Sequence, residues 1–293
     1  MTDRTILIDG DVYAYRAAAS VERATNWGED DTDDGALWTL HADPGDAERS
    51  LEDALHATVE TQLGGADRII IALTDATNWR VSVLPTYKGN RKAVRKPMLL
   101  GFVRQYLRDN YEVWERPGLE GDDILGILMT TDKVVTGEKI CVTIDKDLHT
   151  IPGFHFNNGK PQDGILEVTQ AEADRFHLYQ TLMGDTTDGY TGCPGVGPQV
   201  ASAFLDDPYI LTPEERILKS GKRKGEVDIR WVKMPTEDVW SGIVSLFAKA
   251  GYTEAYALQQ ARVARILRAS DYDFNKKEPR LWMPTILAQN KSL

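Results

Sequence analysis

The sequence predicts an α/β fold with a parallel-type central sheet flanked by helices. Three short apolar segments read as buried strands, and each ends at a carboxylate, namely Asp9, Asp75 and Asp145. Stretches of helical periodicity separate these strands along the chain. Because the carboxyl ends of parallel strands meet at one edge of a sheet, we expect the three carboxylates to collect there and to serve chemistry.

The overall composition is that of a globular protein. The chain has 293 residues, of which 42% are hydrophobic and 27% charged, so neither disorder nor a fibrous class is indicated. No apolar run approaches the roughly 18 residues that a membrane span needs. The N-terminus lacks the features of a signal peptide. Cys141 and Cys193 are far apart and form no metal or redox motif, which favours a reducing compartment. We therefore expect a soluble cytoplasmic protein without a membrane partner.

The charge distribution permits a nucleic-acid partner although the net charge is −11. Residues 80–108 contain no acid, and a second basic cluster occupies residues 219–224. Acid is concentrated elsewhere, notably in residues 29–34, for which the sequence suggests no role. The first basic stretch comprises Arg80, Lys88, Arg91, Lys92, Arg95, Lys96, Arg104 and Arg108.

The first half of the chain alternates strands and helices. A helix over residues 12–21 follows the first strand, and Asp11 is the better candidate for its N-cap than Asp9. Residues 25–46 are turn-rich and suggest a surface insertion. Helical periodicity over residues 47–63 precedes the second strand, residues 67–75. Pro97 suits the start of a helix over residues 98–108, and a third strand follows at 110–115.

A helix over residues 118–129 begins with three acids, Glu120, Asp122 and Asp123. Acids suit a helix N-terminus electrostatically, at about 0.3–1 kcal/mol each. Three exceed that need, so we favour metal ligation. The fourth strand, residues 139–144, leads to Asp145 and Asp147, and residues 154–156 and 164–169 suggest a hairpin.

The segment after a helix at residues 170–183 combines two kinds of chemistry. Asp185 and Asp188 are three residues apart, so on a helical turn their carboxylates face the same way and suit a hard divalent metal. Gly192 to Gly197 form a glycine-rich turn before a helix at 198–205, and such turns can bind phosphate. Alone, these features also fit a solvated helix end and a tight connection. Further on we expect a strand at 226–233 and helices at 237–250 and 254–268, whereas residues 271–293 suggest no chemistry.

Six short motifs in order resemble the 5′ nucleases of the flap endonuclease family. They are Ile-Asp-Gly-Asp11, Thr-Asp75, Tyr-Lys-Gly-Asn-Arg-Lys92, Glu-Gly-Asp-Asp123, Asp-Lys-Asp147 and Met-Gly-Asp-Thr-Thr-Asp188, followed by Gly-Cys-Pro-Gly-Val-Gly197. The similarity to the phage members of this family extends over most of the chain. It implies a PIN-like nuclease core at 1–180 with a helical arch at about 79–110. It also implies a helix–three-turn–helix and C-terminal helical region at 181–293, packed as one compact unit.

The resemblance also implies the site residues. Two or more Mg²⁺ ions, for which Mn²⁺ can substitute, would be held by acids, and basic side chains would act on the phosphate. A K⁺ ion is expected at the helix–three-turn–helix. Gln199 stands where many members have a lysine, which weakens one phosphate contact. The implied metal ligands are Asp9, Asp75, Glu120, Asp122, Asp123, Asp145, Asp147, Asp185 and Asp188; the catalytic cations Lys88, Arg91 and Arg80; and the DNA contacts Lys92, Arg95, Lys96, Gly192, Gly195, Val196, Gly197 and Gln199.

The activity implied is a metal-dependent 5′–3′ exonuclease on duplex DNA that can also remove RNA primers or 5′ flaps in replication or recombination. Replication proteins such as a single-strand binding protein are expected partners, and a phage-encoded chain would work in the host cytoplasm. The sequence leaves three alternatives open: a structure-specific flap endonuclease, a PIN-type ribonuclease, and a non-catalytic module that binds DNA structures. A pure binder would gain nothing from carboxylates clustered near phosphates.

Overall fold

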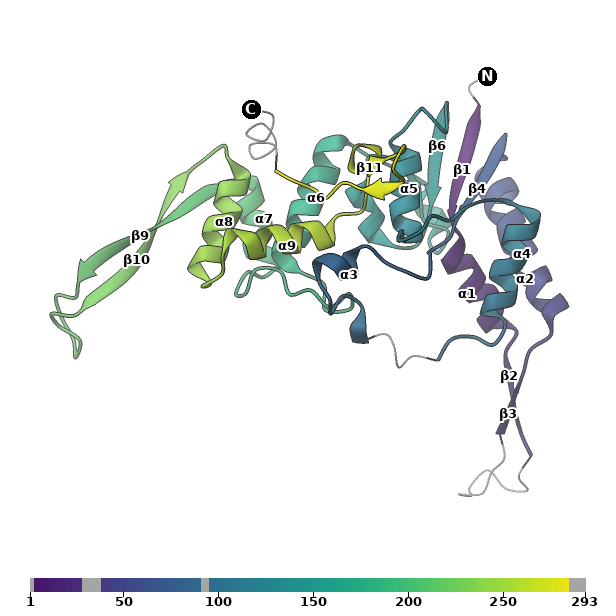
Figure 1. Ribbon diagram of the computed structural model, residues 1–293, viewed down its shortest axis with the longest axis horizontal. Coiled ribbons are helices and arrows are strands. Elements are labelled where there is room, and N and C mark those ends of the chain that lie inside the picture. Colours follow the sequence, from purple (N-terminus) through teal and green to yellow (C-terminus); the bar gives the residue numbers. More distant parts are fainter. Residues whose placement is uncertain (1–2, 28–37, 91–94, 285–293) are drawn as a thin grey trace. The chain divides into compact units, whose positions relative to one another are not determined.

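The structure is a computed structural model that describes residues 3–27, 38–90 and 95–284 (Figure 1). The chain divides into two compact units. Unit 1 comprises Met1–Trp79, Ala93–Ala173 and Ile266–Arg280, and unit 2 comprises Arg80–Lys92, Asp174–Arg265 and Leu281–Leu293. The boundary expected between residues 180 and 181 stays a prediction.

A six-stranded sheet forms the centre of unit 1, in the order β5-β4-β1-β6-β7-β8. All neighbours are parallel except β7 and β8, which form the antiparallel hairpin expected from the sequence. The α/β class with a parallel-type sheet is therefore confirmed. The strands are β1 (Arg4–Asp9), β4 (Arg68–Ala72), β5 (Glu112–Trp114), β6 (Glu138–Val142), β7 (Gly153–Phe156) and β8 (Ile165–Val168).

Helices cover both faces of this sheet. Successive side chains of a strand point to opposite faces, so a strand that is apolar throughout needs helices on both sides to bury it. Ile6 and Ile8 of β1 join a core with α1 (Gly10–Ser20), α2 (Pro44–His56) and α4 (Leu100–Asn110). Leu7 points the other way, into a core with α5 (Gly121–Met129). The segment after Ile266, with the 3₁₀ turn η5 (Ala269–Asp271) and the strands β11 (Tyr272–Asp273) and β12 (Glu278–Pro279), packs on that second face.

Two local expectations in unit 1 need correction. The N-cap of α1 is Asp9, whose side chain accepts a hydrogen bond from the Val12 N–H at 3.3 Å, and not Asp11. The strand thus runs directly into the helix, and Asp11 lies in the first helical turn. The helix expected over residues 47–63 is α2 followed by a π-helix, η1 (Ala57–Gln62).

The remaining segments of unit 1 are short. A hairpin of β2 (Arg23–Asn26) and β3 (Trp38–His41) forms the insertion expected at residues 25–46. The acidic residues 29–34 lie outside the described residues. Two 3₁₀ helices, η3 (Lys146–Thr150) and η4 (Pro161–Asp163), complete the described elements of this unit. The expected arch at about 79–110 contains the short helix α3 (Arg80–Val83) of unit 2 and α4 of unit 1; the arch stays a prediction.

Unit 2 is mainly helical. Its helices are α6 (Gln170–Met183), which begins in unit 1, α7 (Pro198–Asp206), α8 (Val239–Lys249) and α9 (Glu254–Ala264). A long antiparallel hairpin of β9 (Tyr209–Ile217) and β10 (Val227–Pro235) joins α7 to α8. The sequence indicated β10 but missed β9, because Pro213 and two glutamates interrupt any strand pattern. In the described part of the chain, no helix is both long enough and apolar enough to cross a membrane.

Candidate active site

Asp9 lies at the carboxyl end of the central strand β1 and is only 6% exposed. Its second carboxylate oxygen accepts a hydrogen bond from the Thr143 hydroxyl at 3.1 Å. Burial, together with the neighbouring charges of Asp11 and Asp145, raises the pKa of Asp9 to about 6. The carboxylates of Asp9, Asp11 and Asp145 therefore lie near enough to act on one another at this edge of the sheet.

Asp75 follows β4 and is held by donors from its own loop and from the approach to α5. The same carboxylate oxygen accepts hydrogen bonds from the Thr77 hydroxyl at 2.5 Å, the Thr77 N–H at 3.1 Å and the Gly118 N–H at 2.8 Å. These bonds, the hydroxyl first, lower the pKa of Asp75 to about 2. The side chain is thus kept ionised and fixed in direction.

The three acids at the start of α5 have different surroundings. Glu120 is the N-cap and is buried, Asp122 is half-buried, and Asp123 is fully buried. Asp123 accepts hydrogen bonds from the Trp79 indole N–H at 2.9 Å, the Leu267 N–H at 3.1 Å and the Glu120 N–H at 3.3 Å. Both of its carboxylate oxygens are engaged by buried donors. These bonds give Asp123 a structural role, and the metal ligation that the sequence predicted stays a prediction.

Asp145 and Asp147 lie where β6 gives way to η3. Asp145 is exposed and caps η3 by accepting a hydrogen bond from the Asp147 N–H at 2.8 Å. Its own N–H donates to the Thr143 hydroxyl at 3.1 Å, and that hydroxyl donates to Asp9. Thr143 therefore links the ends of β1 and β6, a role that sequence reasoning did not assign.

The order β4-β1-β6 brings the ends of these strands to one edge of the sheet. Among the described residues, no three His, Cys, Asp or Glu side chains form a group that could hold a metal ion. The donors at this edge are carboxylate and hydroxyl oxygens, which are the ligands that Mg²⁺ prefers, and the charges of Asp11 and Asp145 near Asp9 suit a cation. The donor set therefore fits a hard divalent metal in its chemistry.

A second group of site residues lies within unit 2. Asp185 caps its own loop, since one oxygen accepts hydrogen bonds from the Thr187 N–H at 2.7 Å and the Asp188 N–H at 3.2 Å. Asp188 accepts from the Tyr87 hydroxyl at 3.0 Å, and the Lys88 ammonium lies 3.7 Å from the same oxygen. The Asp188 carbonyl also accepts from the Lys88 N–H at 2.8 Å. These contacts join the Tyr87-Lys88 motif to the second aspartate of the pair.

Two backbone features hold this group in place. Lys88 adopts a left-handed conformation with φ of 52°, which is uncommon outside glycine and costs free energy. Gly189 follows Asp188 with φ of 80°, and a Cβ there would lie 3.2 Å from the Thr86 carbonyl oxygen. The two chain segments therefore approach closely through backbone, and strain is concentrated at the lysine that the sequence marks as catalytic.

Arg80 has surroundings that differ from the expectation. Its side chain is 2% exposed and donates hydrogen bonds to the carbonyl oxygens of Val263 at 3.0 Å and Arg265 at 2.6 Å. These carbonyls lie at the C-terminus of α9, which ends at Ala264 and not at residue 268 as expected. These bonds give Arg80 a structural role, and the catalytic role that the sequence predicted stays a prediction.

The other predicted cations divide into three groups. Arg91 and Lys92 lie outside the described residues. Arg95 forms an ion pair with Glu22 at 2.5 Å, and this hydrogen bond lowers the pKa of Glu22 to about 2. Lys96 is exposed. The predicted DNA contacts of Arg95 and Lys96 stay predictions.

The glycine-rich turn leads into a helix as expected. Gly197 is the N-cap of α7, and Pro198 occupies the first helical position. The residues expected to contact DNA surround this helix start: Gly195, with φ of 81°, and Gln199 are exposed, and Val196 and Gly197 are half-buried. Gly192 is buried, and its N–H donates to the Gln260 side chain at 2.9 Å. The turn thus presents the exposed, amide-rich N-terminus of α7, while Gly192 has a packing role.

Arg104 is a site-edge residue that the sequence placed only in the basic stretch. It forms ion pairs with Asp11 at 3.1 Å and Glu115 at 3.3 Å. Asp11 in turn accepts a hydrogen bond from the Thr74 N–H at 2.8 Å, and the Thr74 hydroxyl accepts one from the Gly121 N–H at 2.8 Å. This network ties α1, the end of β4 and the start of α5 together beside the carboxylates.

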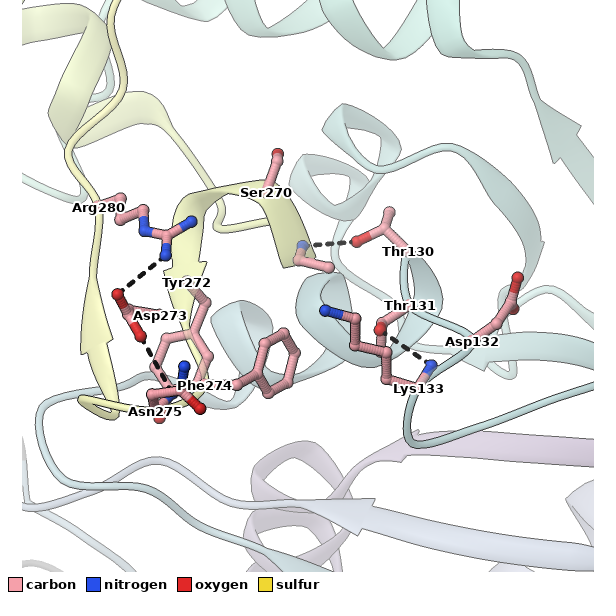
Figure 2. A pocket seen from close by; sticks show the side chains of 11 residues that line it. Thr130, Thr131, Asp132, Lys133, Ser270, Tyr272, Asp273, Phe274, Asn275 and Arg280 are labelled. Carbon is pink, nitrogen blue, oxygen red and sulfur yellow. Dashed lines mark hydrogen bonds and ion pairs between the residues drawn. The ribbon is translucent and has the colours of Figure 1, made fainter.

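A cavity of about 600 Å³ lies at the opposite end of α5 from Glu120 (Figure 2). Figure 2 shows Lys133, Phe274 and the ion pair between Arg280 and Asp273 around it. None of the predicted site residues lines this cavity. It therefore does not belong to the group of carboxylates.

Comparisons with known proteins show a matching family and similar proteins. The family described as "5'-3' exonuclease, N-terminal resolvase-like domain" matches residues 4–155. The exodeoxyribonuclease of Enterobacteria phage T3 is 38% identical over an alignment of 295 positions that covers 96% of this chain and 94% of that protein. The exonuclease of Escherichia phage T7 is 38% identical over 297 residues with the same coverage. The T5 D15 protein, crystallised with metal ions, shares the fold with a TM-score of 0.54 at 15% identity, covering 90% of this chain and 89% of that one.

Proposed function

Because this chain belongs to the 5′–3′ exonuclease family, we propose that it hydrolyses phosphodiester bonds from the 5′ end of duplex DNA with the help of divalent metal ions. The chain is an enzyme, a nuclease of the 5′–3′ exonuclease and flap nuclease type. The observation that carries the proposal is 38% identity to a phage exodeoxyribonuclease over nearly the full length of both chains.

Two or more Mg²⁺ ions, replaceable by Mn²⁺, are the proposed cofactors. The T5 D15 protein of the same fold was crystallised with metal ions, and the oxygen-only donors here suit such ions. The residues proposed to hold them are Asp9, Asp75, Glu120, Asp122, Asp145 and Asp147 in unit 1, and Asp185 and Asp188 in unit 2. Asp123 would act through Glu120, whose N–H it binds. Bound divalent ions supply activation of a water molecule and stabilisation of the leaving oxygen.

The chain's own groups would bind and orient the phosphate. The Lys88 ammonium is held beside Asp188, and its positive charge would offset charge that develops on the phosphate. Tyr87 fixes the Asp188 carboxylate through its hydroxyl, which also keeps the lysine in position. Arg91 is proposed as the second cation on the phosphate, and Lys92, Arg95 and Lys96 as contacts to the DNA backbone.

The start of α7 is proposed as the duplex-binding element. Its exposed amides and positive dipole end can bind backbone phosphates, and Gln199 can donate one further hydrogen bond. We place the K⁺ ion at the same turn. RNA primers and 5′ flaps are further proposed substrates, and a single-strand binding protein a proposed partner, in the host cytoplasm.

The test uses 5′-phosphorylated linear duplex DNA labelled at either end, with Mg²⁺ or with EDTA. We expect nucleotides to be released from the 5′ end only with Mg²⁺, and Asp145→Asn to abolish the release. Asp53→Asn is the matched control, because Asp53 is an exposed acid on α2 of the same unit, outside the loops that follow the strands. Binding without cleavage in both Mg²⁺ and Mn²⁺ would overturn the proposal. Substrates with a 5′ flap or with an RNA segment at the 5′ end, assayed in parallel, show which kind of 5′ end the enzyme cleaves best.

A further inference from the structure

The β9–β10 hairpin is a long ribbon built on the helices of unit 2. Its strands pair in unbroken register from Tyr209 opposite Pro235 to Ile217 opposite Val227. Nine residues at about 3.4 Å each give an arm of about 30 Å. Only its base is packed, since Leu211 is buried and its N–H donates to the Ser245 hydroxyl of α8 at 2.9 Å. Figure 1 shows the rest of the ribbon extending away from α7 and α8.

The two faces of the arm differ in chemistry. One carries charges paired across the strands, with Arg216 bonded to Asp228 at 2.8 Å. The other carries apolar side chains that the described residues leave in solvent: Ile217 is 66% exposed, and Val227 and Ile229 are each 58% exposed. A solvent-exposed two-stranded ribbon gains little stability from such a face. The face suits contact with another molecule.

The tip of the arm is a compact basic loop. Residues 218–225 contain four cations and no acid. The loop is closed by hydrogen bonds between the Leu218 N–H and the Glu226 carbonyl at 3.0 Å, and between the Gly225 N–H and the Leu218 carbonyl at 2.9 Å. Arg223 is paired with Glu226 at 2.7 Å, whereas no ion pair to the three tip lysines occurs among the described residues. Those lysines are Lys219, Lys222 and Lys224, all exposed.

The base of the arm adjoins the helix proposed to bind the duplex. A groove of about 600 Å³ has Gln199 and Val200 of α7 on one side and Tyr209 and Lys233 of the hairpin on the other. The Lys233 ammonium lies 4.1 Å from the centre of the Tyr209 ring. The start of α7 and the arm thus border one groove of the same unit.

We propose that the β9–β10 hairpin is a second duplex-binding arm, whose tip lysines contact the phosphate backbone of DNA held at α7. The proposal rests on the function proposed above. An exposed apolar face alone would suit a protein partner equally well. Three exposed ammonium groups at the end of the ribbon, with no ion pair to any described residue, favour a polyanion, because each contact with a phosphate releases bound counterions. An arm of about 30 Å corresponds to about nine base pairs at 3.4 Å per pair.

The test compares wild type with the triple variant Lys219→Gln, Lys222→Gln and Lys224→Gln. Binding to blunt, 5′-phosphorylated duplexes is measured in EDTA as a function of salt. Three lost phosphate contacts lower the slope of log K against log salt by about 2.7, so the ratio of variant to wild-type Kd falls about 40-fold between about 50 and 200 mM salt. We expect this difference on a duplex of about 30 base pairs and little of it on one of about 6 base pairs, which is shorter than the arm.

A second triple variant, Lys160→Gln, Lys249→Gln and Lys276→Gln, removes the same charge from exposed positions outside the arm and should keep the wild-type slope. Equal salt-dependence slopes for wild type and the tip variant would overturn the proposed DNA-binding role of the arm. A protein partner that binds the hairpin without weakening DNA binding would overturn it as well. Failure of wild type to bind or cut duplex DNA at all would instead overturn the proposed function. Mg²⁺-dependent cleavage of the short duplex should be unchanged in the tip variant.

Discussion

Asp122 and Asp123 are adjacent acids whose substitution should separate chemistry from stability. Asp123→Asn keeps the shape of the side chain but replaces one carboxylate oxygen with an NH₂ group. The carboxylate accepts from Trp79 and Glu120 on one oxygen and from Leu267 on the other. The asparagine oxygen can accept hydrogen bonds at only one of these two positions. Its NH₂ group occupies the other position and must face at least one buried N–H, which is also a donor.

The expected loss of stability follows from these bonds. A hydrogen bond to a charged acceptor contributes about 1.5–3 kcal/mol, and a buried donor left without a partner costs about 1–3 kcal/mol. We therefore expect Asp123→Asn to lower the free energy of unfolding by about 3 kcal/mol. Asp122→Asn, at the half-buried neighbouring position, should change it by less than about 1 kcal/mol, the usual value of an acid in a first helical turn.

Urea unfolding in EDTA measures both changes, and Mg²⁺-dependent release of 5′ nucleotides measures activity. Asp122→Asn should lose activity at nearly unchanged stability, whereas Asp123→Asn should keep measurable activity at temperatures where it stays folded. If Asp123→Asn unfolds like wild type and is as inactive as Asp122→Asn, the structural assignment of Asp123 is refuted.

Three further outcomes follow from single contacts. Gly126→Ala should lower the free energy of unfolding by about 1–3 kcal/mol in urea, because its Cβ would collide with the Leu267 carbonyl oxygen. Burial lowers the pKa of His155 from 6.5 to about 4, so protonation of this side chain favours the unfolded chain. The free energy of unfolding should be at its full value above about pH 6.5 and lower by about 2 kcal/mol at pH 5. Urea unfolding at both pH values measures this loss, which should be absent from His155→Phe. Lys88→Met should reduce kcat for duplex cleavage by about 10²–10³-fold and lower Tm by less than about 3 °C, since the ion pair with Asp188 that it loses is partly exposed.

Features carried by local sequence pattern were predictable. Apolar strands that end in acids place Asp9, Asp75 and Asp145 at strand ends, and the order β4-β1-β6 brings those ends side by side. The hairpin after β6 and the helices of unit 2 follow from alternation and periodicity. The strand β9 was missed because Pro213 and adjacent charges are tolerated only where a strand has solvent on both faces.

Features carried by distant contacts were not predictable. The donor that satisfies one oxygen of Asp123 lies 144 residues away, at Leu267, and the carbonyls that fix Arg80 lie 183 and 185 residues away. Residue type and spacing show that a charge is present, but not whether it faces solvent or a buried partner. A sequence motif therefore does not distinguish charged residues that stabilise the fold from charged residues that act on the substrate.

The same distinction explains how a chain with a net charge of −11 can bind a polyanion. Charges interact through water over about 10 Å at 0.1 M salt, so the net charge of a large protein is not felt at every point of its surface. Along the β9–β10 arm, about 30 Å separates the tip lysines from the base, which is about three such lengths. The tip therefore presents a positive field that carboxylates at the base of the arm scarcely reduce. The acids needed for metal chemistry and the cations needed for DNA can thus be kept in one acidic protein without cancelling each other.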